Sequence, residues 1–319
     1  MVFYYFGILI SMKTILKIFA GILIFIGISA IGKQIAHNTR PPQLVNQDQK
    51  ITTTQTAGKN DTEIVLRDVK YGPDKQNTMN VYIPKGASST TPFILFIHGG
   101  AWVSGDKNDV AIVQLALGKE NIASASINYR FASETVHYPE LMADVNRAVD
   151  YIVAHGKDWN VDTNKIAIGG ISAGAHMSML YAYAYDMGNH IDAVISLAGP
   201  SNIADYTILD ASVKNKLIGG VNSMVGVDYV SGETLDQKFA DASPINHIKN
   251  IPTLLVHGTG DTVVMYDQSV KMNTALANAG VPHQLLSIPG ANHDLGLANP
   301  VTATQITNAV VSWIKKYEK

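Results

Sequence analysis

Short apolar runs recur along the chain from residue 62 onwards, and each is followed by a segment with helical periodicity. Phe93–Ile97, Ile166–Ile168 and Ile191–Leu197 are mostly apolar, as strands covered on both faces of a sheet usually are. Further strands of this kind are predicted at Asn121–Asn128, Thr253–His257 and His283–Ile288.

Helices are predicted between these strands. Pro139 opens one whose apolar residues fall on a single face: Leu141, Val145, Ala148, Val149 and Ile152. The others span Ala175–Asp186, Gln268–Ala279 (ending at Gly280) and Thr304–Tyr317. Upstream, Thr62–Val69 and Asn80–Pro84 predict a hairpin. Repeated strand-then-helix units indicate the α/β class, with a doubly wound and mostly parallel sheet.

One segment, Gly199–Ile245, interrupts this rhythm. It contains no clean strand, and Gly219–Gly220 and Gly226 are expected to break it up. Because it lies between two predicted strands, it should cross the carboxyl edge of the sheet. We interpret it as a small cap over a site there, with a plain surface insertion as the alternative.

The amino-terminal part has a different composition. Residues 18–32 are free of charge and follow Lys13 and Lys17, which is typical of a secretory signal starting at Met12. An uncleaved membrane anchor is the alternative, so residues 1–33 are expected to export the protein (periplasmic or secreted) or to anchor it. Residues 34–61 are polar, include Pro41–Pro42, and predict a flexible linker. Residues 62–319 remain for the catalytic domain.

Composition narrows the possible functions. Of the 319 residues, 46% are hydrophobic and 16% charged, which excludes a disordered chain. The net charge of −2 gives no case for nucleic acid, and with no cysteine the chain has no thiolate metal site and no cysteine nucleophile. No metal-binding spacing occurs among the histidines. The expected partner is a small molecule, membrane contact is expected only through the amino-terminal segment, and the oligomeric state is not predicted.

The strongest candidate for chemistry is Ser172, in the G-x-S-x-G pattern Gly170–Gly174. A serine at a sharp strand-to-helix turn stands above the sheet in a strained backbone conformation, and flanking glycines let strand and helix close around it. The N–H group of the next residue, Ala173, is then directed at an oxyanion formed on the substrate.

A serine nucleophile also needs a base and an orienting acid, in the chain order serine, acid, histidine for this type of turn. Asp261 follows the Thr253–His257 strand, where sites form in open α/β sheets. His293 lies in a glycine-flanked loop after the last strand. Asp294 is the alternative acid, but adjacent residues point apart. Asp267 is expected at the surface, and His155, His176, His247 and His283 are expected to be structural or exposed.

A second oxyanion donor is expected from the loop His98–Trp102, with sequence HGGAW. Successive glycines allow backbone N–H groups to turn toward a bound oxygen. Gly100 and Ala101 are the assigned donors, with Gly99 as an alternative, and His98 is expected to brace the loop. Trp102 lines a substrate pocket or has a purely structural role.

These motifs, together with Asn128–Arg130 and Ala242–Ile245, resemble the α/β-hydrolase esterases and lipases related to hormone-sensitive lipase and to bacterial feruloyl and acetyl-xylan esterases. The resemblance runs from about Thr62 to the carboxyl end. It implies a serine carboxylic ester hydrolase that needs no cofactor and acts through an acyl-enzyme on short-acyl or aryl esters.

Two alternatives stay open. Much of the hormone-sensitive-lipase group carries HGGG, whereas Ala101 gives HGGxW, which is also the pattern of arylformamidases (kynurenine formamidases). The export signal argues against that cytosolic activity. A non-catalytic binding module of the same fold is the more remote alternative, because all triad positions are filled.

Overall fold

The computed structural model describes residues 2–5, 8–11 and 60–318. They fall into two compact units, Met1–Lys59 and Asn60–Lys319. In the first, β1 (Val2–Tyr5) and β2 (Ile8–Ser11) form an antiparallel pair with Val2 opposite Ser11. The uncharged run at residues 18–32 on which the export prediction rests, and nearly all of the predicted linker, lie outside the described residues. Over the described part of the chain, no helix is long and apolar enough to cross a membrane.

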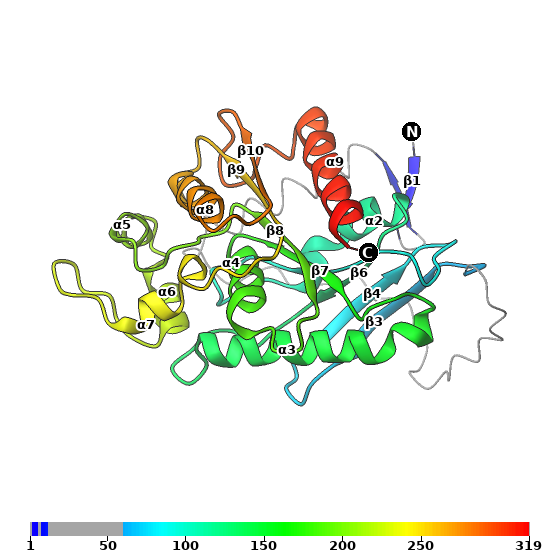
Figure 1. Ribbon diagram of the computed structural model, residues 1–319, viewed down its shortest axis with the longest axis horizontal. Coiled ribbons are helices and arrows are strands. Elements are labelled where there is room, and N and C mark those ends of the chain that lie inside the picture. The colour runs from blue at the N-terminus through cyan, green and yellow to red at the C-terminus, as the bar shows by residue number, and fades with distance from the viewer. Residues whose placement is uncertain (1, 6–7, 12–59, 319) are drawn as a thin grey trace, which may run out of the picture. The chain divides into compact units, whose positions relative to one another are not determined.

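The second unit is built on an eight-stranded sheet in the order β10-β9-β8-β7-β5-β6-β4-β3 (Figure 1). All pairs from β10 to β6 are parallel, and β4 joins β6 and β3 in antiparallel pairs. The strands are β3 (Ile64–Lys70), β4 (Thr78–Ile83), β5 (Phe93–Ile97), β6 (Ala123–Ile127), β7 (Ile166–Ile171), β8 (Ile191–Leu197), β9 (Thr253–Gly258) and β10 (His283–Ile288). The predicted doubly wound, mostly parallel sheet and its amino-terminal hairpin are confirmed.

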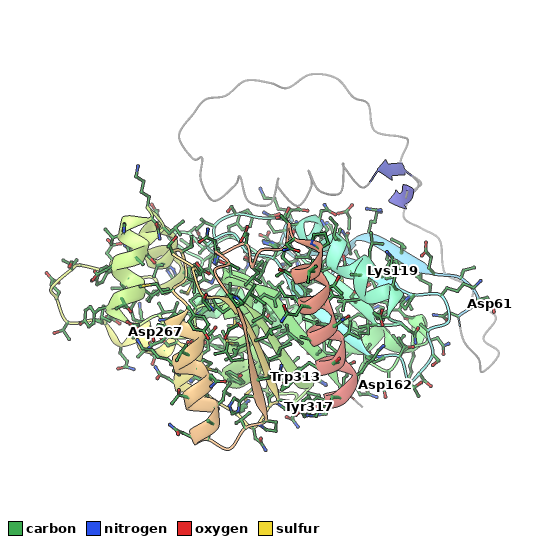
Figure 2. All side chains as sticks on the ribbon, turned by 90° about the horizontal axis from the view of Figure 1, so that it is seen from above. Asp61, Lys119, Asp162, Asp267, Trp313 and Tyr317 are labelled. Atoms are coloured by element: carbon green, nitrogen blue, oxygen red, sulfur yellow. The ribbon has the colours of Figure 1, made fainter. Side chains whose placement is uncertain are left out.

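Helices cover both faces of this sheet. Alternate residues of β5 divide between two apolar clusters, with Phe93 and Leu95 in one and Ile94 and Phe96 in the other. The first cluster lies under α3 (Tyr138–His155), α4 (Ala173–Leu180) and α8 (Asp267–Asn278), and the second under α2 (Ala111–Lys119) and α9 (Pro300–Tyr317). Figure 1 shows α3 and α9 on opposite sides of the strands, and Figure 2 shows Trp313 and Tyr317 together near the carboxyl end of α9.

The helix predicted at Ala175–Asp186 begins earlier and changes form. α4 starts at Ala173, directly after the serine, and gives way at Tyr181 to a π-helical turn, η3 (Tyr181–Tyr185). In this turn Tyr183 is buried and its hydroxyl lies 2.5 Å from the hydroxyl of Thr253 on β9. The wider turn therefore places a large side chain against a strand that belongs to the core. Short 3₁₀ turns are η1 (Lys107–Val110), η2 (Gly156–Trp159) and η4 (Pro244–Asn246).

The segment after β8 is helical and forms the predicted insertion. It contains α5 (Tyr206–Lys214), α6 (Ile218–Val225) and α7 (Gln237–Asp241), which we call the cap. One expectation was wrong: Gly219–Gly220 lie inside α6 and do not break the segment. Gly226, with φ 78°, does end that helix in the left-handed conformation that glycine favours.

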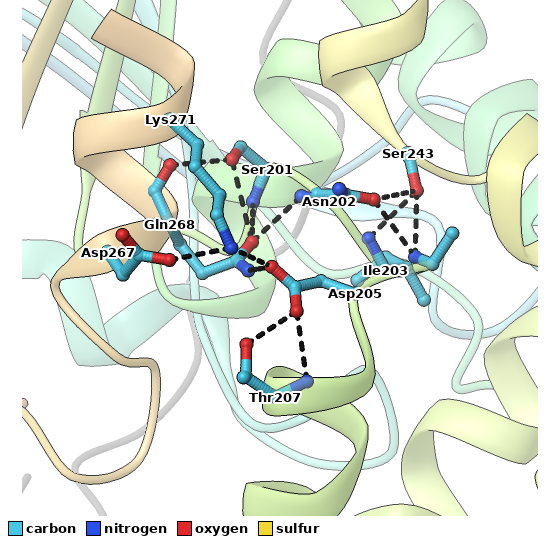
Figure 3. A network of polar contacts seen from close by, with 10 residues as sticks. Ser201, Asn202, Ile203, Asp205, Thr207, Ser243, Asp267, Gln268 and Lys271 are labelled. Carbon is cyan, nitrogen blue, oxygen red and sulfur yellow. Dashed lines mark hydrogen bonds and ion pairs between the residues drawn. The ribbon is translucent and has the colours of Figure 1, made fainter. Parts of the chain in front are cut away.

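A polar network joins the start of the cap to α8 (Figure 3). The side-chain oxygen of Gln268 accepts the backbone N–H groups of Ser201 and Asn202, at 3.0 and 2.8 Å. Asp205 caps the amino end of α5 and pairs with Lys271 at 2.5 Å. Because α8 packs on β9 and β10, the root of the cap is fastened to the sheet.

The end of the cap is held at the same place. The hydroxyl of Ser243 accepts the N–H group of Ile203 at 2.8 Å and donates to the carbonyl oxygen of Phe239 at 2.7 Å. Ser243 belongs to the Ala242–Ile245 segment that contributed to the resemblance, so this part of the motif has a structural role. The two ends of the cap are thus tied to each other, and the first of them is also tied to α8.

Candidate active site

Ser172 lies at the tip of the turn between β7 and α4. Its φ of 55° and ψ of −121° are unusual for a residue with a side chain, so the expected backbone strain is present. Its N–H group donates to the carbonyl oxygen of Leu197 at 2.8 Å, which holds the turn against β8. A Cβ atom on Gly174 would lie 2.1 Å from the carbonyl oxygen of Ile97, so only glycine lets helix and strand approach this closely.

Three distant residues meet at this turn. Nε2 of His293 lies 2.9 Å from Oγ of Ser172, and Nδ1 lies 2.7 Å from Oδ2 of Asp261. Since a carboxylate only accepts, Nδ1 carries the proton and Nε2 is free to accept the serine hydroxyl proton. The three predicted residues therefore form one continuous hydrogen-bonded chain with the tautomer that a general base requires.

Asp261 is held ionised by its surroundings. Burial opposes its charge, but hydrogen bonds from His257 and His293 outweigh burial and lower the pKa of Asp261 to about 2. Its other oxygen, Oδ1, accepts the backbone N–H groups of Val263 and Val264 at 2.8 and 3.0 Å. The carboxylate is thus fixed in orientation and negatively charged over the whole range in which a histidine titrates.

His257 supports this carboxylate from β9, four residues before it. Its Nε2 lies 2.8 Å from the carbonyl oxygen of Val264 and 3.2 Å from Oδ2 of Asp261, so it donates to both. Nδ1 then accepts the hydroxyl proton of Ser269 at 2.6 Å. The sequence analysis quoted His257 only as the end of a strand, although its spacing of four residues from Asp261 could have suggested a contact.

The loop after β5 reaches the same edge of the sheet. β5 and β7 are neighbours in the sheet, but β6 follows β5 on one side and β8 follows β7 on the other. A crevice forms at such a point, where the order of the strands reverses. Gly100, Ala101 and Trp102 have φ values of 118°, 49° and 63°, so the loop is tightly curled. Ala101 and Trp102 line one pocket together with Ser172 and Ala173. The assignment of Gly99, Gly100, Ala101 and Ala173 as oxyanion donors stays a prediction that this placement allows.

His98 braces this loop, as expected from the sequence. Its Nδ1 donates to the carbonyl oxygen of Gly99 at 2.6 Å. Its ring stacks on Tyr129 with centroids 4.6 Å apart, and the Tyr129 hydroxyl donates to the His98 carbonyl oxygen at 3.4 Å. Tyr129 comes from the Asn128–Arg130 segment, which therefore supports the loop from beneath.

His176 joins the His98–Trp102 loop to α4. It lies one turn after Ser172, and its backbone N–H group donates to the Ser172 carbonyl oxygen at 3.0 Å. The indole N–H group of Trp102 donates to Nδ1 of His176 at 3.1 Å, and Nε2 donates to the carbonyl oxygen of Ala242 at 2.8 Å. Trp102 thus lines the pocket and also has a structural role, and His176 has a specific role that the sequence did not reveal.

The other candidate residues lie away from this chemistry. Asp294 accepts the N–H group of Gly296 within its own loop, and Asp267 pairs with Lys271 at 2.6 Å near the surface. His155 and His247 bond to nearby backbone carbonyl groups, as does His283. Within the described residues, no three His, Asp or Glu side chains are grouped to hold a metal ion.

Known proteins share this organisation. Isoprenylcysteine α-carbonyl methylesterase ICME of Arabidopsis thaliana is 25% identical over 260 residues, covering 74% of this chain and 58% of that protein. Esterase LipC of Mycobacterium tuberculosis is 27% identical over 274 residues, covering 79% of this chain and 65% of that protein. The chain spans 52% to 60% of the length of five plant proteins named as established or probable isoprenylcysteine methylesterases.

Two solved structures are similar over most of the chain. A truncated carbohydrate esterase from gut microbiota has a TM-score of 0.63 at 23% identity, covering 82% of this chain and 100% of that one. Esterase B from Lactobacillus rhamnosis has a TM-score of 0.62 at 18% identity, covering 79% of this chain and 87% of that one. At these identities the structures show a shared fold, which is the predicted α/β-hydrolase fold.

The family is shown by a match to residues 79–276, more than half of the chain. This range includes Ser172, Asp261, the His98–Trp102 loop and the cap, and it confirms the resemblance seen in the sequence. The chain belongs to the BD-FAE family.

Proposed function

We propose that the protein is a carboxylic ester hydrolase in which Ser172 is the nucleophile and an acyl-enzyme is the intermediate. The observation that carries the proposal is the chain of hydrogen bonds from Ser172 through His293 to Asp261, 2.9 and 2.7 Å long. The relatives named as esterases support the same chemistry. No cofactor takes part in the proposed reaction.

The first half of the reaction forms the acyl-enzyme. Oγ of Ser172 bonds to the ester carbonyl carbon while Nε2 of His293 takes the hydroxyl proton. Ionised Asp261 stabilises the imidazolium that results. The carbonyl oxygen becomes an oxyanion at the N–H groups of Ala173 and the Gly100–Ala101 backbone, and each such donor contributes roughly 2.7–4 kcal/mol of transition-state stabilisation.

The intermediate then collapses. The bond to the alcohol oxygen breaks, and His293 returns its proton to that oxygen as the alcohol leaves. Water next gives a proton to His293 and bonds to the acyl carbon. Collapse of this second intermediate breaks the bond from the acyl carbon to Oγ of Ser172, which takes the proton back from His293, and the carboxylic acid is released. Both halves use the same base and the same oxyanion donors.

Turnover of p-nitrophenyl acetate by the purified protein tests the proposal. Ser172→Ala should leave less than about a thousandth of wild-type kcat, because removal of the nucleophile removes the whole covalent route. Ser312→Ala, an exposed serine on α9, is the matched control and should retain full activity. Full activity in Ser172→Ala would refute the assignment.

The two alternatives have their own tests. N-Formylkynurenine and acetate esters compared at equal enzyme concentration separate an arylformamidase from an esterase. A fluorophosphonate probe separates both from a binding module, since only an activated serine reacts with it. Labelling that is absent from the wild-type protein would favour the binding module.

We also propose that the protein acts outside the cytoplasm. The support is the uncharged run at residues 18–32 behind two lysines, which is typical of an export signal or an anchor. Amino-terminal sequencing of the mature protein from its native host separates cleavage from retention. An intact amino terminus in a soluble cytoplasmic fraction would contradict export.

A further inference from the structure

The carboxylate of Asp261 has two histidines beside one of its oxygen atoms. Oδ2 lies 2.7 Å from Nδ1 of His293 and 3.2 Å from Nε2 of His257. The proposed reaction uses the first of these contacts as the link to the base. His257 is fully buried on β9 and is not a group that the reaction itself needs. A second imidazole at this oxygen atom therefore needs an explanation of its own.

The loop after Asp261 is closed by the aspartate side chain and by His257. Oδ1 of Asp261 accepts the N–H groups of Val263 and Val264, so that oxygen is committed to the loop. The carbonyl oxygen of Val264 in turn accepts Nε2–H of His257 at 2.8 Å. His257 thus contacts the carboxylate directly and also holds the backbone that orients it.

The partners of His257 select one arrangement of its protons. Nε2 faces two acceptors, the carbonyl oxygen of Val264 and Oδ2 of Asp261, so it carries a hydrogen that the two acceptors share. Nδ1 lies 2.6 Å from the hydroxyl of Ser269, which donates to it. The other tautomer would set the lone pair of Nε2 against two acceptors. A neutral ring with its proton on Nε2 satisfies every one of these groups.

The plane of this ring is fixed from two further elements. Ser269 is buried in the first turn of α8. Tyr266 packs edge-on against the His257 ring, with centroids 5.8 Å apart and planes at 82°. The Tyr266 hydroxyl lies 2.5 Å from the hydroxyl of Ser287 on β10. The ring is therefore held by α8 on one side and, through Tyr266, by β10 on another.

The charges around Asp261 make this contact matter for its protonation. Within the described residues, the titratable groups that face the carboxylate are His257 and His293, while Asp267 and Lys271 on α8 pair with each other near the surface. Burial raises the pKa of Asp261, but the hydrogen bonds from the two histidines outweigh it and lower the pKa to about 2. Without the donor on His257 the carboxylate would be more basic. A proton on Asp261 or on His293 would then be retained to higher pH.

The cap also touches this edge of the sheet. A Cβ atom on Gly220 would lie 2.7 Å from the carbonyl oxygen of Ala101, so α6 rests directly on the His98–Trp102 loop. Asn215, at the end of α5, donates its side-chain N–H group to the carbonyl oxygen of Thr262 at 2.8 Å. Asn215 therefore ties down the loop of Asp261 by its backbone alone, which makes it a control for the role of His257.

We propose that His257 is a positioning residue for the acid Asp261 and that Ser269 fixes the tautomer in which His257 acts. A chain of contacts then runs from α8 to the nucleophile: Ser269, His257, Asp261, His293 and Ser172. The inference rests on the proposed ester hydrolysis and adds two residues that act through Asp261.

The first test uses the wild-type protein. Nitrogen-15 NMR of labelled histidine side chains distinguishes a protonated ring nitrogen from an unprotonated one. At neutral pH it should show a proton on Nε2 of His257 and none on Nδ1. A proton on Nδ1 would overturn the inference, and this result does not depend on whether any variant folds.

The second test is the pH profile of kcat/KM for p-nitrophenyl acetate. His257→Phe keeps a flat ring but removes the donor, so kcat should fall about tenfold to a hundredfold with KM little changed. The midpoint of the acidic limb should move to higher pH, because the carboxylate is more basic. His257→Gln should recover most of both effects, since its amide nitrogen carries two hydrogens, one for each acceptor.

Ser269→Ala tests the hydroxyl separately. The ring keeps its donor to Asp261 but loses the partner that fixes it, so kcat and the midpoint should change in the same direction as in His257→Phe and by less. A folded Ser269→Ala variant with wild-type kcat and midpoint would overturn the role of Ser269.

Two controls match these changes. Thr253→Val removes a buried hydroxyl from the same face of β9, where Thr253 contacts Tyr183. Asn215→Ala releases the loop from the cap. Both variants should keep the wild-type midpoint, with thermal unfolding measured for every protein. Equal shifts in His257→Phe and Thr253→Val would overturn the inference, as would a folded His257→Phe variant with wild-type kcat and midpoint.

Failure of the proposed function is a different result. In that case the wild-type protein turns over no ester, and a fluorophosphonate does not label Ser172. The NMR measurement on His257 does not depend on turnover, so the two failures are distinguished.

Discussion

Trp102 donates its indole N–H group to Nδ1 of His176 across 3.1 Å, and this bond joins the His98–Trp102 loop to the helix that begins after Ser172. The ring planes are nearly perpendicular, at 85°. Burial lowers the pKa of His176 to about 4, although the hydrogen bond to Ala242 opposes this shift. The imidazole is therefore neutral at neutral pH, and its single tautomer suits both partners.

Trp102→Phe should lower both stability and activity. The variant leaves Nδ1 of His176 buried without a donor, which costs about 1–3 kcal/mol of unfolding free energy. We expect kcat to fall by roughly tenfold or more with KM little changed, because the loosened loop shifts the oxyanion donors. Chemical denaturation and steady-state kinetics with p-nitrophenyl acetate measure the two effects.

Trp313→Phe is the control for this experiment. Trp313 is buried like Trp102, but it packs on the other face of the sheet. Its indole N–H group donates to the carbonyl oxygen of Pro252 at 3.5 Å. It should leave kcat unchanged. If both tryptophan variants lower kcat equally, the effect comes from general loosening of the fold and not from the link to His176.

Asp261→Asn should reduce kcat by roughly 10⁴-fold at neutral pH, because an amide can donate to Nδ1 and so favours the wrong imidazole tautomer. Asp294→Asn is the matched control, since Asp294 adjoins His293 but bonds to Gly296. It should retain most of the activity. A larger loss of kcat in Asp294→Asn than in Asp261→Asn would show that Asp294, and not Asp261, is the acid that orients His293.

Asp261 also contributes a pH-dependent part of the stability. Its pKa is about 2 in the folded protein, below the usual 3.8, so the stabilisation is complete above pH 3.8 and is lost as the pH falls from there toward 2. Unfolding measured across this interval should be less dependent on pH in Asp261→Asn than in the wild type.

Gln268→Ala should destabilise the protein more than Lys271→Ala. The first change removes the acceptor of the buried N–H group of Ser201 and of the half-buried N–H group of Asn202, which costs about 2–4 kcal/mol in total. The second removes two ion pairs, with Asp205 and Asp267, that share a lysine side chain 41% exposed, and each such pair contributes about 1 kcal/mol or less. Urea denaturation of both variants makes the comparison, and the reverse order would show that the ion pair holds the cap.

Glu318→Gln should stabilise the protein at high pH. Burial raises the pKa of Glu318 well above its ordinary value, although the backbone N–H groups of Phe93 and Ala167 favour the charge. Within the described residues, its Oε2 atom is buried without a hydrogen-bond partner. The fold therefore favours the protonated acid.

The sign follows from this preference. A raised carboxyl pKa gives stabilisation that is complete below the ordinary pKa near 4.5 and is lost as the pH rises through the folded value. Thermal unfolding of Glu318→Gln should match the wild type near pH 4 and exceed it at pH 8. Glu120→Gln, at an exposed position, should follow the wild type at both values. Identical pH profiles for all three proteins would contradict the assignment.

Much of the fold could be predicted because its signals are local. β5 and β8 have the predicted bounds because a buried parallel strand is a mostly apolar run, and the half-buried edge strand β10 also has its predicted bounds. The turn at Ser172 was equally visible, because only glycines permit the contact between Gly174 and Ile97. The chain order serine, acid, histidine then identified Asp261 and His293 from the sequence. In the folded protein both side chains lie in one hydrogen-bonded chain with Ser172.

Other elements have no such local signal. α2 was not predicted because seven of its nine residues are Ala, Ile, Val, Leu or Gly. The sequence therefore has no polar face from which the helical period could be recognised. The hydrogen bonds of His176 depend on partners 74 and 66 residues away, which no spacing reveals. Its position four residues after Ser172 was the available hint, since residues at this spacing share a helix face.

The contact between Gly220 and Ala101 restricts how this architecture can be recombined. The cap leaves the sheet after β8 and returns before β9, so it could be exchanged as a unit between related chains while the three hydrogen-bonded residues stay in place. A transplanted cap would, however, press on the His98–Trp102 loop wherever it carried a side chain at the position of Gly220. Chimaeras that keep this one small residue should retain turnover of p-nitrophenyl acetate.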